Sequence, residues 1–160
     1  RNRDRRMADP PTDPMTNRSD FAFFHPLRVR YSEIDGQGVV YNAHYLTYFD
    51  VAITEYLRWL DYAYPLGGDP ETGTDFHLVK SLVEYKAPIV YDEEVEVGVR
   101  VGRLGNSSVT FDLAIFPKGG DEARSTGEIV WVNTDQKAHK SVPLPKGFID
   151  ALTARGEAPA

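Results

Sequence analysis

The segment from Tyr31 to Phe49, YSEIDGQGVVYNAHYLTYF, holds the residue types best suited to chemistry in this chain. Its carboxylate, Asp35, is followed at once by Gly36 and Gly38, which let the backbone turn sharply and leave room for a ligand. A helix predicted to begin near Asn42 would offer unpaired backbone N–H groups and the positive end of its dipole. A substrate carbonyl between these two features would be polarised by the amides, while Asp35 acts as nucleophile or general base.

A purely structural interpretation of the same segment is also open. Glu33 or Asp35 could simply complement the dipole of the helix that follows. Asp35 precedes Asn42 by seven residues, which is too far for a side-chain cap, so Asn42 itself is the better cap candidate. The residues alone do not choose between the catalytic and the structural interpretation.

Other catalytic patterns are missing from the sequence. It contains no GxSxG, HExxH or EF-hand loop. The stretch GQGVVYN lacks the third glycine and the βαβ unit of a dinucleotide-binding fold. With no cysteine there is no disulfide, thiolate metal site or cysteine nucleophile. The histidines lack metal-ligand spacing, and we expect neither a metal nor a cofactor; they stand at positions 25, 44, 77 and 139.

Composition indicates one globular domain of a cytoplasmic protein. The length of 160 residues suits a single domain with a real core. A formal net charge of -6 argues against a nucleic-acid partner, although it allows a local basic patch for an anionic ligand. No apolar run approaches the roughly 18 residues of a membrane span, and the N-terminal residues lack the apolar core of a signal peptide.

The elements that must position Asp35 follow from periodicity. Residues 1–20 and 151–160 are predicted to be tails, the first of them disordered, around a domain at 21–150. Alternation from Phe23 to Tyr31 predicts a strand, and an uninterrupted stretch from Asn42 to about Tyr62 predicts a helix of roughly five to six turns. Four more strands follow, with no second helix. This order is typical of an α+β fold whose antiparallel sheet is covered on one face by one helix.

Three stretches resemble a known family. RVRYSEIDGQGVVYNAHYLTYFDVA resembles the signature of the 4-hydroxybenzoyl-CoA thioesterase-like family of hotdog-fold acyl-CoA thioesterases. VEVGVRVGRLGNSSVTFDLAIF and STGEIVWVNTDQKAHKSVPLP are similar to its later strands and its ending, so the resemblance covers roughly residues 22–150. It implies a five-stranded antiparallel sheet wrapped around one long helix, and acyl-CoA hydrolysis at the interface of a homodimer or homotetramer.

The resemblance also assigns roles. It implies that Asp35 is the catalytic carboxylate and that the backbone amide of Asn42 polarises the thioester carbonyl. Many relatives carry histidine at the position of Asn42, so no side-chain role is carried over there. Further substrate contacts are expected from Gly38, Val39, Val40, Tyr41, His44 and Tyr45. Asp50 and Glu55 are alternative carboxylates on the helix. Candidate contacts to the phosphates of CoA are Arg100, Arg103, Lys118, Arg124, Lys137 and Lys140.

Two other functions stay open. A hotdog hydratase or dehydratase usually carries an Asp-x-x-x-x-His pair, but the fifth residue after Asp35 is Val40. A non-catalytic acyl-CoA-binding regulator tends to carry a DNA-binding segment, and a tail of 20 residues is too short for a helix-turn-helix. The acyl group, the choice between nucleophile and general base, and the choice between dimer and tetramer are not determined by the sequence.

Overall fold

The structure is a computed structural model that describes residues 16–64 and 68–160. Its elements follow an α+β order, in which one long helix near the start is followed by a run of consecutive strands and a short final helix. In chain order they are η1 (Arg18–Asp20), β1 (Phe23–Arg28), η2 (Tyr31–Glu33), α1 (His44–Trp59), β2 (Thr74–Tyr85), β3 (Glu94–Leu104), β4 (Ser108–Pro117), β5 (Ser125–Asp135), β6 (Lys140–Ser141) and α2 (Lys146–Ala154).

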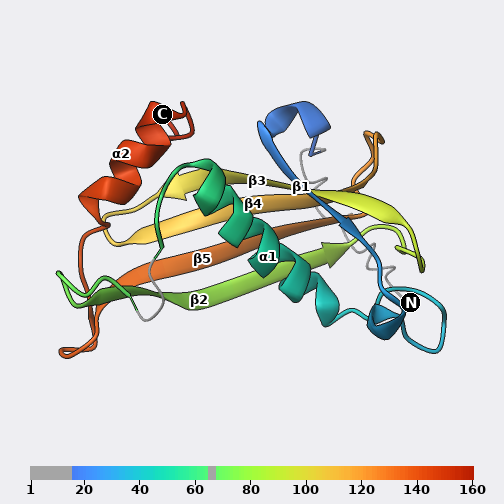
Figure 1. Ribbon diagram of the computed structural model, residues 1–160, viewed down its shortest axis with the longest axis horizontal. Coiled ribbons are helices and arrows are strands. Elements are labelled where there is room, and N and C mark those ends of the chain that lie inside the picture. Colours follow the sequence, from blue (N-terminus) through green and yellow to red (C-terminus); the bar gives the residue numbers. More distant parts are fainter. Residues whose placement is uncertain (1–15, 65–67) are drawn as a thin grey trace, which may run out of the picture.

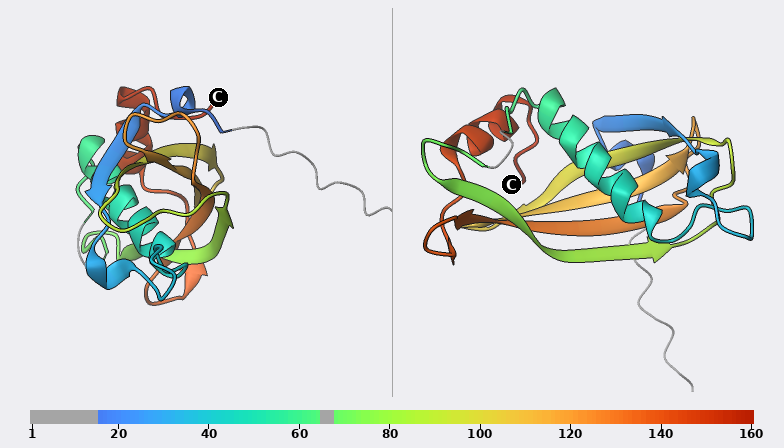
Figure 2. Two further views of the ribbon diagram at one scale, coloured as in Figure 1. Left: turned by 90° about the vertical axis from the view of Figure 1, so that its right-hand side faces the viewer. Right: turned by 60° about the horizontal axis from the view of Figure 1, so that its bottom comes forward.

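The strands form one antiparallel sheet in the order β1-β3-β4-β5-β2, and the short β6 pairs with β5. The sheet curves around α1, which crosses its concave face (Figures 1 and 2). The predicted five-stranded sheet with one long helix is therefore confirmed, with β6 as a two-residue addition.

The core lies between α1 and the concave face of the sheet. Alternate residues of β3 and β4 point into it, which is what the period of two predicted. The helix contributes mainly aromatic side chains, each of which stabilises the fold by roughly 1.5–3 kcal/mol when fully buried. The most deeply buried side chains of this core include Phe49, Ile53, Tyr56, Val97, Val99, Phe111 and Leu113.

Close approach of α1 to the sheet requires a glycine on β5. A Cβ atom at Gly127 would lie 2.3 Å from Cε2 of Phe49, which is far inside van der Waals contact. Phe49 is fully buried, so its ring has no free space to move into. The position of α1 over the sheet therefore depends on the missing side chain at Gly127.

The helix boundaries differ from the prediction of Asn42 to about Tyr62. Helix α1 begins at His44, its N-cap is Ala43, and no side chain caps it, so the prediction of Asn42 as cap is wrong. At the other end the chain leaves the helix at Leu60, and Asp61 adopts a left-handed φ of 57°. Periodicity located the helix, but tertiary contacts set its ends.

The prediction of no second helix is wrong, and so is the tail from residue 151. Helix α2 contains Phe148 and Leu152, which are one turn apart and fully buried in the main core. Just beyond it, the Glu157 carboxylate accepts a hydrogen bond of 2.8 Å from the Tyr56 hydroxyl of α1. The prolines before Lys146 indicated a loop, but the residues after them form a short amphipathic helix, and its apolar face covers one end of the core.

The predicted N-terminal tail lies mostly outside the described residues, which begin at 16. Within them, residues 18–20 form η1 and are not a disordered tail. The Arg18 guanidinium pairs with Glu96 at 2.9 Å and lies 4.4 Å from the centre of the Phe24 ring. This segment packs on the sheet face opposite α1, where Phe21 and Phe116 are also buried.

We expect Gly127→Ala to lower the free energy of unfolding by about 1–3 kcal/mol, because the new methyl group overpacks against the Phe49 ring. Urea denaturation followed by circular dichroism measures the change. Gly36→Ala is the matched control, since a Cβ there meets nothing within 4 Å. An equal loss in both variants would contradict the packing argument.

We expect Leu152→Ala to lower the free energy of unfolding by about 2–5 kcal/mol, because it leaves a cavity in the core. Its neighbour Thr153 is exposed, so Thr153→Ala should change stability by only about 0.5 kcal/mol or less. Thermal and urea unfolding of both variants compare the two sites. A Leu152→Ala variant as stable as the wild type would show that α2 adds nothing to the core.

Candidate active site

Asp35 lies at the tip of a tight hairpin. Its backbone N–H donates to the Val39 carbonyl at 2.9 Å, and its own carbonyl accepts from the Gly38 N–H at 3.0 Å. Gly38 adopts a φ of 77°, a left-handed conformation that a non-glycine residue rarely tolerates. One carboxylate oxygen, Oδ1, accepts from the Gln37 N–H at 2.8 Å, so the side chain is held in one orientation while staying partly accessible.

The two legs of this hairpin are fixed to the rest of the fold. Ile34 pairs with Val40, and the Tyr41 N–H donates to the Glu33 carbonyl at 2.9 Å. On its other side the returning leg meets the segment after β2, where the Val40 N–H donates to the Ile89 carbonyl at 2.8 Å. Backbone hydrogen bonds therefore position Asp35 without help from side chains.

The returning leg leads directly to the start of α1. Asn42 and Ala43 are exposed, and neither of their N–H groups donates to any residue in the described part of the chain. Ala43 is the N-cap and has the orphan donor expected at a helix N-terminus, and the Asn42 N–H lies one residue before it, where the dipole favours negative charge. A hydrogen bond of 3.0 Å from the Tyr85 hydroxyl to the Asn42 carbonyl helps to fix the orientation of this peptide.

Tyr85 was missed by the sequence analysis. It comes from the end of β2, 43 residues after Asn42, and its ring packs against Tyr45 with centroids 4.8 Å apart. Only the register of β2 against β5 and the curvature of the sheet bring it to the helix start. No local pattern in the sequence carries that information.

The predicted substrate contacts fall into two groups. Gly38 and Val39 are at the hairpin, and Tyr41 is exposed beside His44, with ring centroids 5.9 Å apart. By contrast, Val40 and Tyr45 are each only 3 % exposed and belong to the core. In the single chain these two side chains pack in the core beneath the site and do not line its surface.

Buried tyrosines near the site stay protonated. Burial raises the pKa of Tyr45, with the neighbouring Tyr85 adding to the effect. Burial also raises the pKa of Tyr48 strongly, and the nearby Glu33 carboxylate adds to it. A phenol with a raised pKa is neutral at physiological pH, so neither residue can serve as a phenolate base there.

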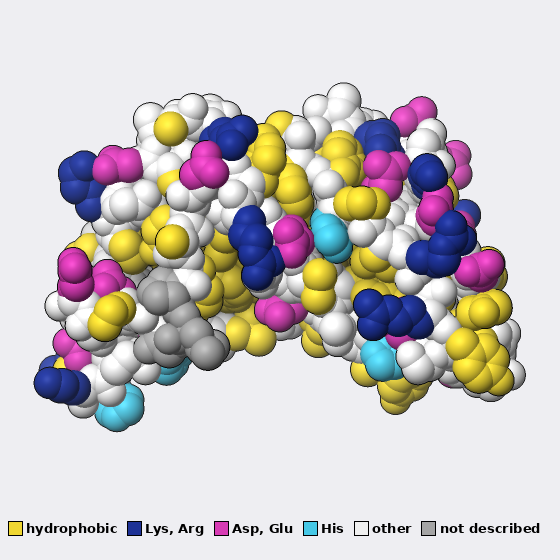
Figure 3. Space-filling model, viewed as in Figure 1, with side chains coloured by type: hydrophobic (Ala, Val, Ile, Leu, Met, Phe, Trp, Pro, Cys, Tyr) yellow, Lys and Arg dark blue, Asp and Glu magenta, His cyan; other side chains and the backbone are white. Residues whose placement is uncertain are grey.

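The alternative helix carboxylates have different surroundings. Glu55 forms an ion pair with Arg58 on the exposed side of α1. Asp50 lies in an open groove of about 340 Å³ between α1, β2 and β5. Leu46, Ile53, Leu78, Ile129 and Trp131 give this groove an apolar lining. Figure 3 shows hydrophobic side chains gathered on this face of the molecule.

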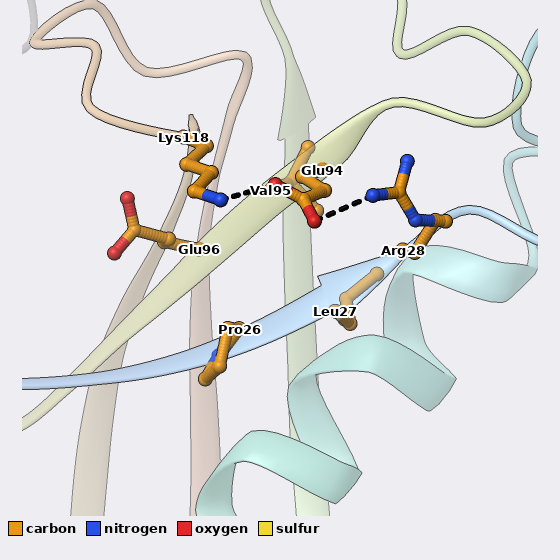
Figure 4. Close-up of a pocket in the computed structure, with 7 residues that line it drawn as sticks. All are labelled: Pro26, Leu27, Arg28, Glu94, Val95, Glu96 and Lys118. Atoms are coloured by element: carbon orange, nitrogen blue, oxygen red, sulfur yellow. Dashed lines mark hydrogen bonds and ion pairs between the residues drawn. The ribbon is translucent and has the colours of Figure 1, made fainter.

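The predicted CoA-binding cations are not brought together. Lys118 and Arg124 lie at one end of the sheet, next to the residue pairs Pro117–Val95 and Ser125–Ile115. Arg103, Lys137 and Lys140 lie towards the opposite end of the sheet. Three of the six are also engaged by carboxylates: Arg100 by Asp112, Lys118 by Glu94 and Arg124 by Glu93. Figure 4 shows Glu94 between Lys118 and Arg28.

The described residues contain neither a metal-binding cluster nor a membrane-spanning helix. Within 16–64 and 68–160 no group of three or more His, Asp or Glu side chains could hold a metal ion. None of the helices in those ranges is long and apolar enough to cross a membrane.

Comparison with known proteins identifies the family. The profile of the thioesterase-like superfamily matches residues 29–152, which span both the hairpin and the sheet. The chain belongs to this superfamily. The resemblance noted in the sequence is thereby confirmed, and so is the expectation of an enzyme of the thioester hydrolase class.

Individual relatives agree with this assignment. A putative esterase of Aquifex aeolicus is 29% identical over 130 residues, which cover 81% of this chain and 97% of the relative. The acyl-CoA thioester hydrolase YbgC of Escherichia coli is 28% identical over 127 residues, covering 79% of this chain and 92% of its own length.

Solved structures support the same fold. The PA5185 protein of Pseudomonas aeruginosa is 34% identical and superposes with a TM-score of 0.75, covering 88% of this chain and 96% of that one. A 1,4-dihydroxy-2-naphthoyl-CoA thioesterase from Synechocystis is 18% identical, with a TM-score of 0.77 over 85% of this chain and 98% of that one. The latter likeness concerns the fold alone, and it confirms the predicted hotdog arrangement.

Proposed function

We propose that this protein hydrolyses an acyl-CoA thioester to a free acid and CoA, with Asp35 as the reacting carboxylate. The observation that carries the proposal is the hairpin, which holds Asp35 at its tip and returns directly into the unpaired N–H groups at the start of α1. The relatives named as acyl-CoA thioester hydrolases support the substrate class. The hairpin would supply the carboxylate and the helix would supply the carbonyl-polarising donor.

The proposed chemistry divides between the two parts of the site. The thioester oxygen accepts a hydrogen bond from the Asn42 N–H, which stabilises the charge that develops there; one such donor is typically worth ~2.7–4 kcal/mol of barrier. Asp35 then either attacks the carbonyl carbon, giving a mixed anhydride and releasing CoA, or removes a proton from an attacking water. The Gln37 N–H orients Oδ1 in both routes.

We expect Asp35→Asn to lower kcat for acyl-CoA hydrolysis by about 10²–10⁴-fold, because an amide is neither a nucleophile nor a base here. Release of the CoA thiol, followed with a thiol-reactive dye over a panel of acyl-CoA substrates, measures the rate. Glu55→Gln is the matched control, since its ion pair is exposed and remote from the hairpin. Full activity in Asp35→Asn would refute the assignment, and tight acyl-CoA binding by a wild type without turnover would favour a binding module.

A single turnover in oxygen-18 water separates the two routes. If Asp35 attacks directly, hydrolysis of the anhydride at the Asp35 carbonyl places label in its carboxylate, which mass spectrometry of the peptide detects. Label found there would rule out the general-base route. The control is the same peptide from protein incubated in oxygen-18 water without substrate.

We propose further that the functional unit is a homodimer or a larger homo-oligomer. Strand β2 is an edge strand of twelve residues, and in the described sheet it pairs only with β5. Large apolar side chains along it stay exposed in the single chain: Leu78 at 59%, Val79 at 59%, Leu82 at 44% and Tyr85 at 54%. A long apolar edge of this kind is a template for another copy of the chain.

We expect Val79→Lys to shift the assembly towards monomers and to lower turnover, because a charge on the apolar edge opposes pairing. Size-exclusion chromatography with light scattering gives the mass of each variant. Ala154→Lys adds the same charge at an exposed position of α2 and should leave the mass unchanged. A wild type that is monomeric and fully active would contradict the proposed oligomer.

A further inference from the structure

A second pocket lies beside the Asp35 hairpin. It is an open pocket with a volume of about 480 Å³, and it is lined by the end of β1, the start of η2 and the loop after residue 90. The bridge between Val39 and Val90 joins this loop to the hairpin. Tyr31, which lines the pocket, precedes Asp35 by four residues, so their Cα atoms are at most about 14 Å apart.

Two exposed aromatic rings form one wall of this pocket. Tyr31 is 76% exposed and Tyr91 is 50% exposed, and their centroids lie 5.8 Å apart at right angles. Large apolar surfaces left in water at a concave site are suited to covering a flat ligand. Aromatic side chains offer such a surface to any nucleobase, whatever its hydrogen-bonding edge.

The pocket also contains a cation without a partner. Arg30 is exposed and forms no ion pair with any residue that the structure describes. Arg28, which also lines the pocket, is shared with Asp92 at 3.5 Å and Glu94 at 2.6 Å. Because Arg28 is already engaged by two carboxylates, Arg30 is the guanidinium of this pocket that is available to phosphate oxygens.

None of the other three pockets described contains a cation that lacks an ion pair. In the one shown in Figure 4, Arg28 and Lys118 are offset by Glu94 and Glu96. The groove between α1 and β2 contains only the negative Asp50. A third, on the sheet face opposite α1, sets Arg100 against the carboxylates of Glu84, Asp112 and Glu128. Of the four, the pocket at Arg30 is the one whose lining includes an arginine without an ion pair among the described residues.

We propose that this pocket binds the nucleotide end of CoA, with the adenine against Tyr31 and Tyr91 and the phosphates at Arg30. The inference rests on the proposed acyl-CoA substrate and places its nucleotide and its thioester at neighbouring sites. The flexible pantetheine arm then runs from the pocket to the carbonyl at Asp35. The six cations expected from the sequence have no part in this arrangement.

The test compares two substrates that share the thioester and differ in the nucleotide. One is an acyl-CoA, and the other is the corresponding acyl-pantetheine, which has no phosphate and no adenine. For Tyr31→Ala and for Arg30→Gln, the ratio of kcat/KM on acyl-CoA to kcat/KM on acyl-pantetheine should fall about tenfold, which is the size expected for one base–aromatic stack or one charged contact.

Three further variants sharpen this comparison. Tyr31→Phe keeps the ring and should retain the wild-type ratio. Arg30→Lys should recover part of it, with a stronger dependence on ionic strength. Arg58→Gln removes an exposed cation at the far end of α1 and should leave the ratio unchanged. An unchanged ratio in Tyr31→Ala and Arg30→Gln, or an equal fall in Arg58→Gln, would overturn the proposed subsite.

Binding of adenosine 3′,5′-bisphosphate separates this inference from the proposed function. Titration followed by nuclear magnetic resonance should show saturable binding that Arg30→Gln weakens about tenfold. A protein without thioesterase activity that still binds this nucleotide at Arg30 would refute the proposed function and keep the subsite. A protein that hydrolyses acyl-CoA but binds the nucleotide equally well in wild type and Arg30→Gln would refute the subsite alone.

Discussion

The packing of α1 against the concave face of the sheet is the constraint on which the rest of the structure depends. One face of the helix is buried, and its aromatic side chains fill the space that the curved strands enclose. Gly127 permits the approach, and Phe49 occupies the room that a side chain there would take. Once the helix is held at this depth, the location of its first N–H groups is fixed as well.

The hairpin before α1 places a carboxylate close to these N–H groups, and the two together form the candidate site. Its turn is formed by glycines and backbone hydrogen bonds, and its returning leg is paired on both sides. Asp35 is therefore positioned by rigid main chain at the tip, while its carboxylate keeps access to a ligand. A carboxylate and backbone N–H groups held in this way are suited to acyl transfer, so the chain needs neither a cysteine nor a cluster of histidines for it.

Most cationic side chains in the described part of the chain form ion pairs with carboxylates, so the cations without a partner are candidates for binding an anion. Arg28 of β1 and Arg100 of β3 pair with carboxylates on adjacent strands, and Arg124 in the β4–β5 connection pairs with Glu93 just before β3. Such largely exposed pairs add little stability. Their main consequence is that few cations remain available for an anionic ligand. Arg30, which follows the end of β1, forms no ion pair among the described residues: Asp92 pairs with Arg28, and the Glu33 carboxylate accepts a hydrogen bond of 2.7 Å from the Arg30 backbone N–H.

Local patterns in the sequence determined the class of fold, the long helix, the strands and the segment that contains Asp35. Those features follow from periods of two and three to four residues and from turn chemistry, which short stretches of chain express by themselves. Two features that depend on contacts between distant segments were not predicted: the buried face of α2 and the pairing of η1 with β3.

Only the tertiary structure decided which side chains surround the site. Tyr85 reaches the helix start because β2 pairs with β5 in one register, and Tyr91 meets Tyr31 because Val90 pairs with the hairpin. Ion pairing across strands likewise decided which cations are free. These contacts join residues tens of positions apart, and they depend on register and sheet curvature, which no local pattern of residues encodes.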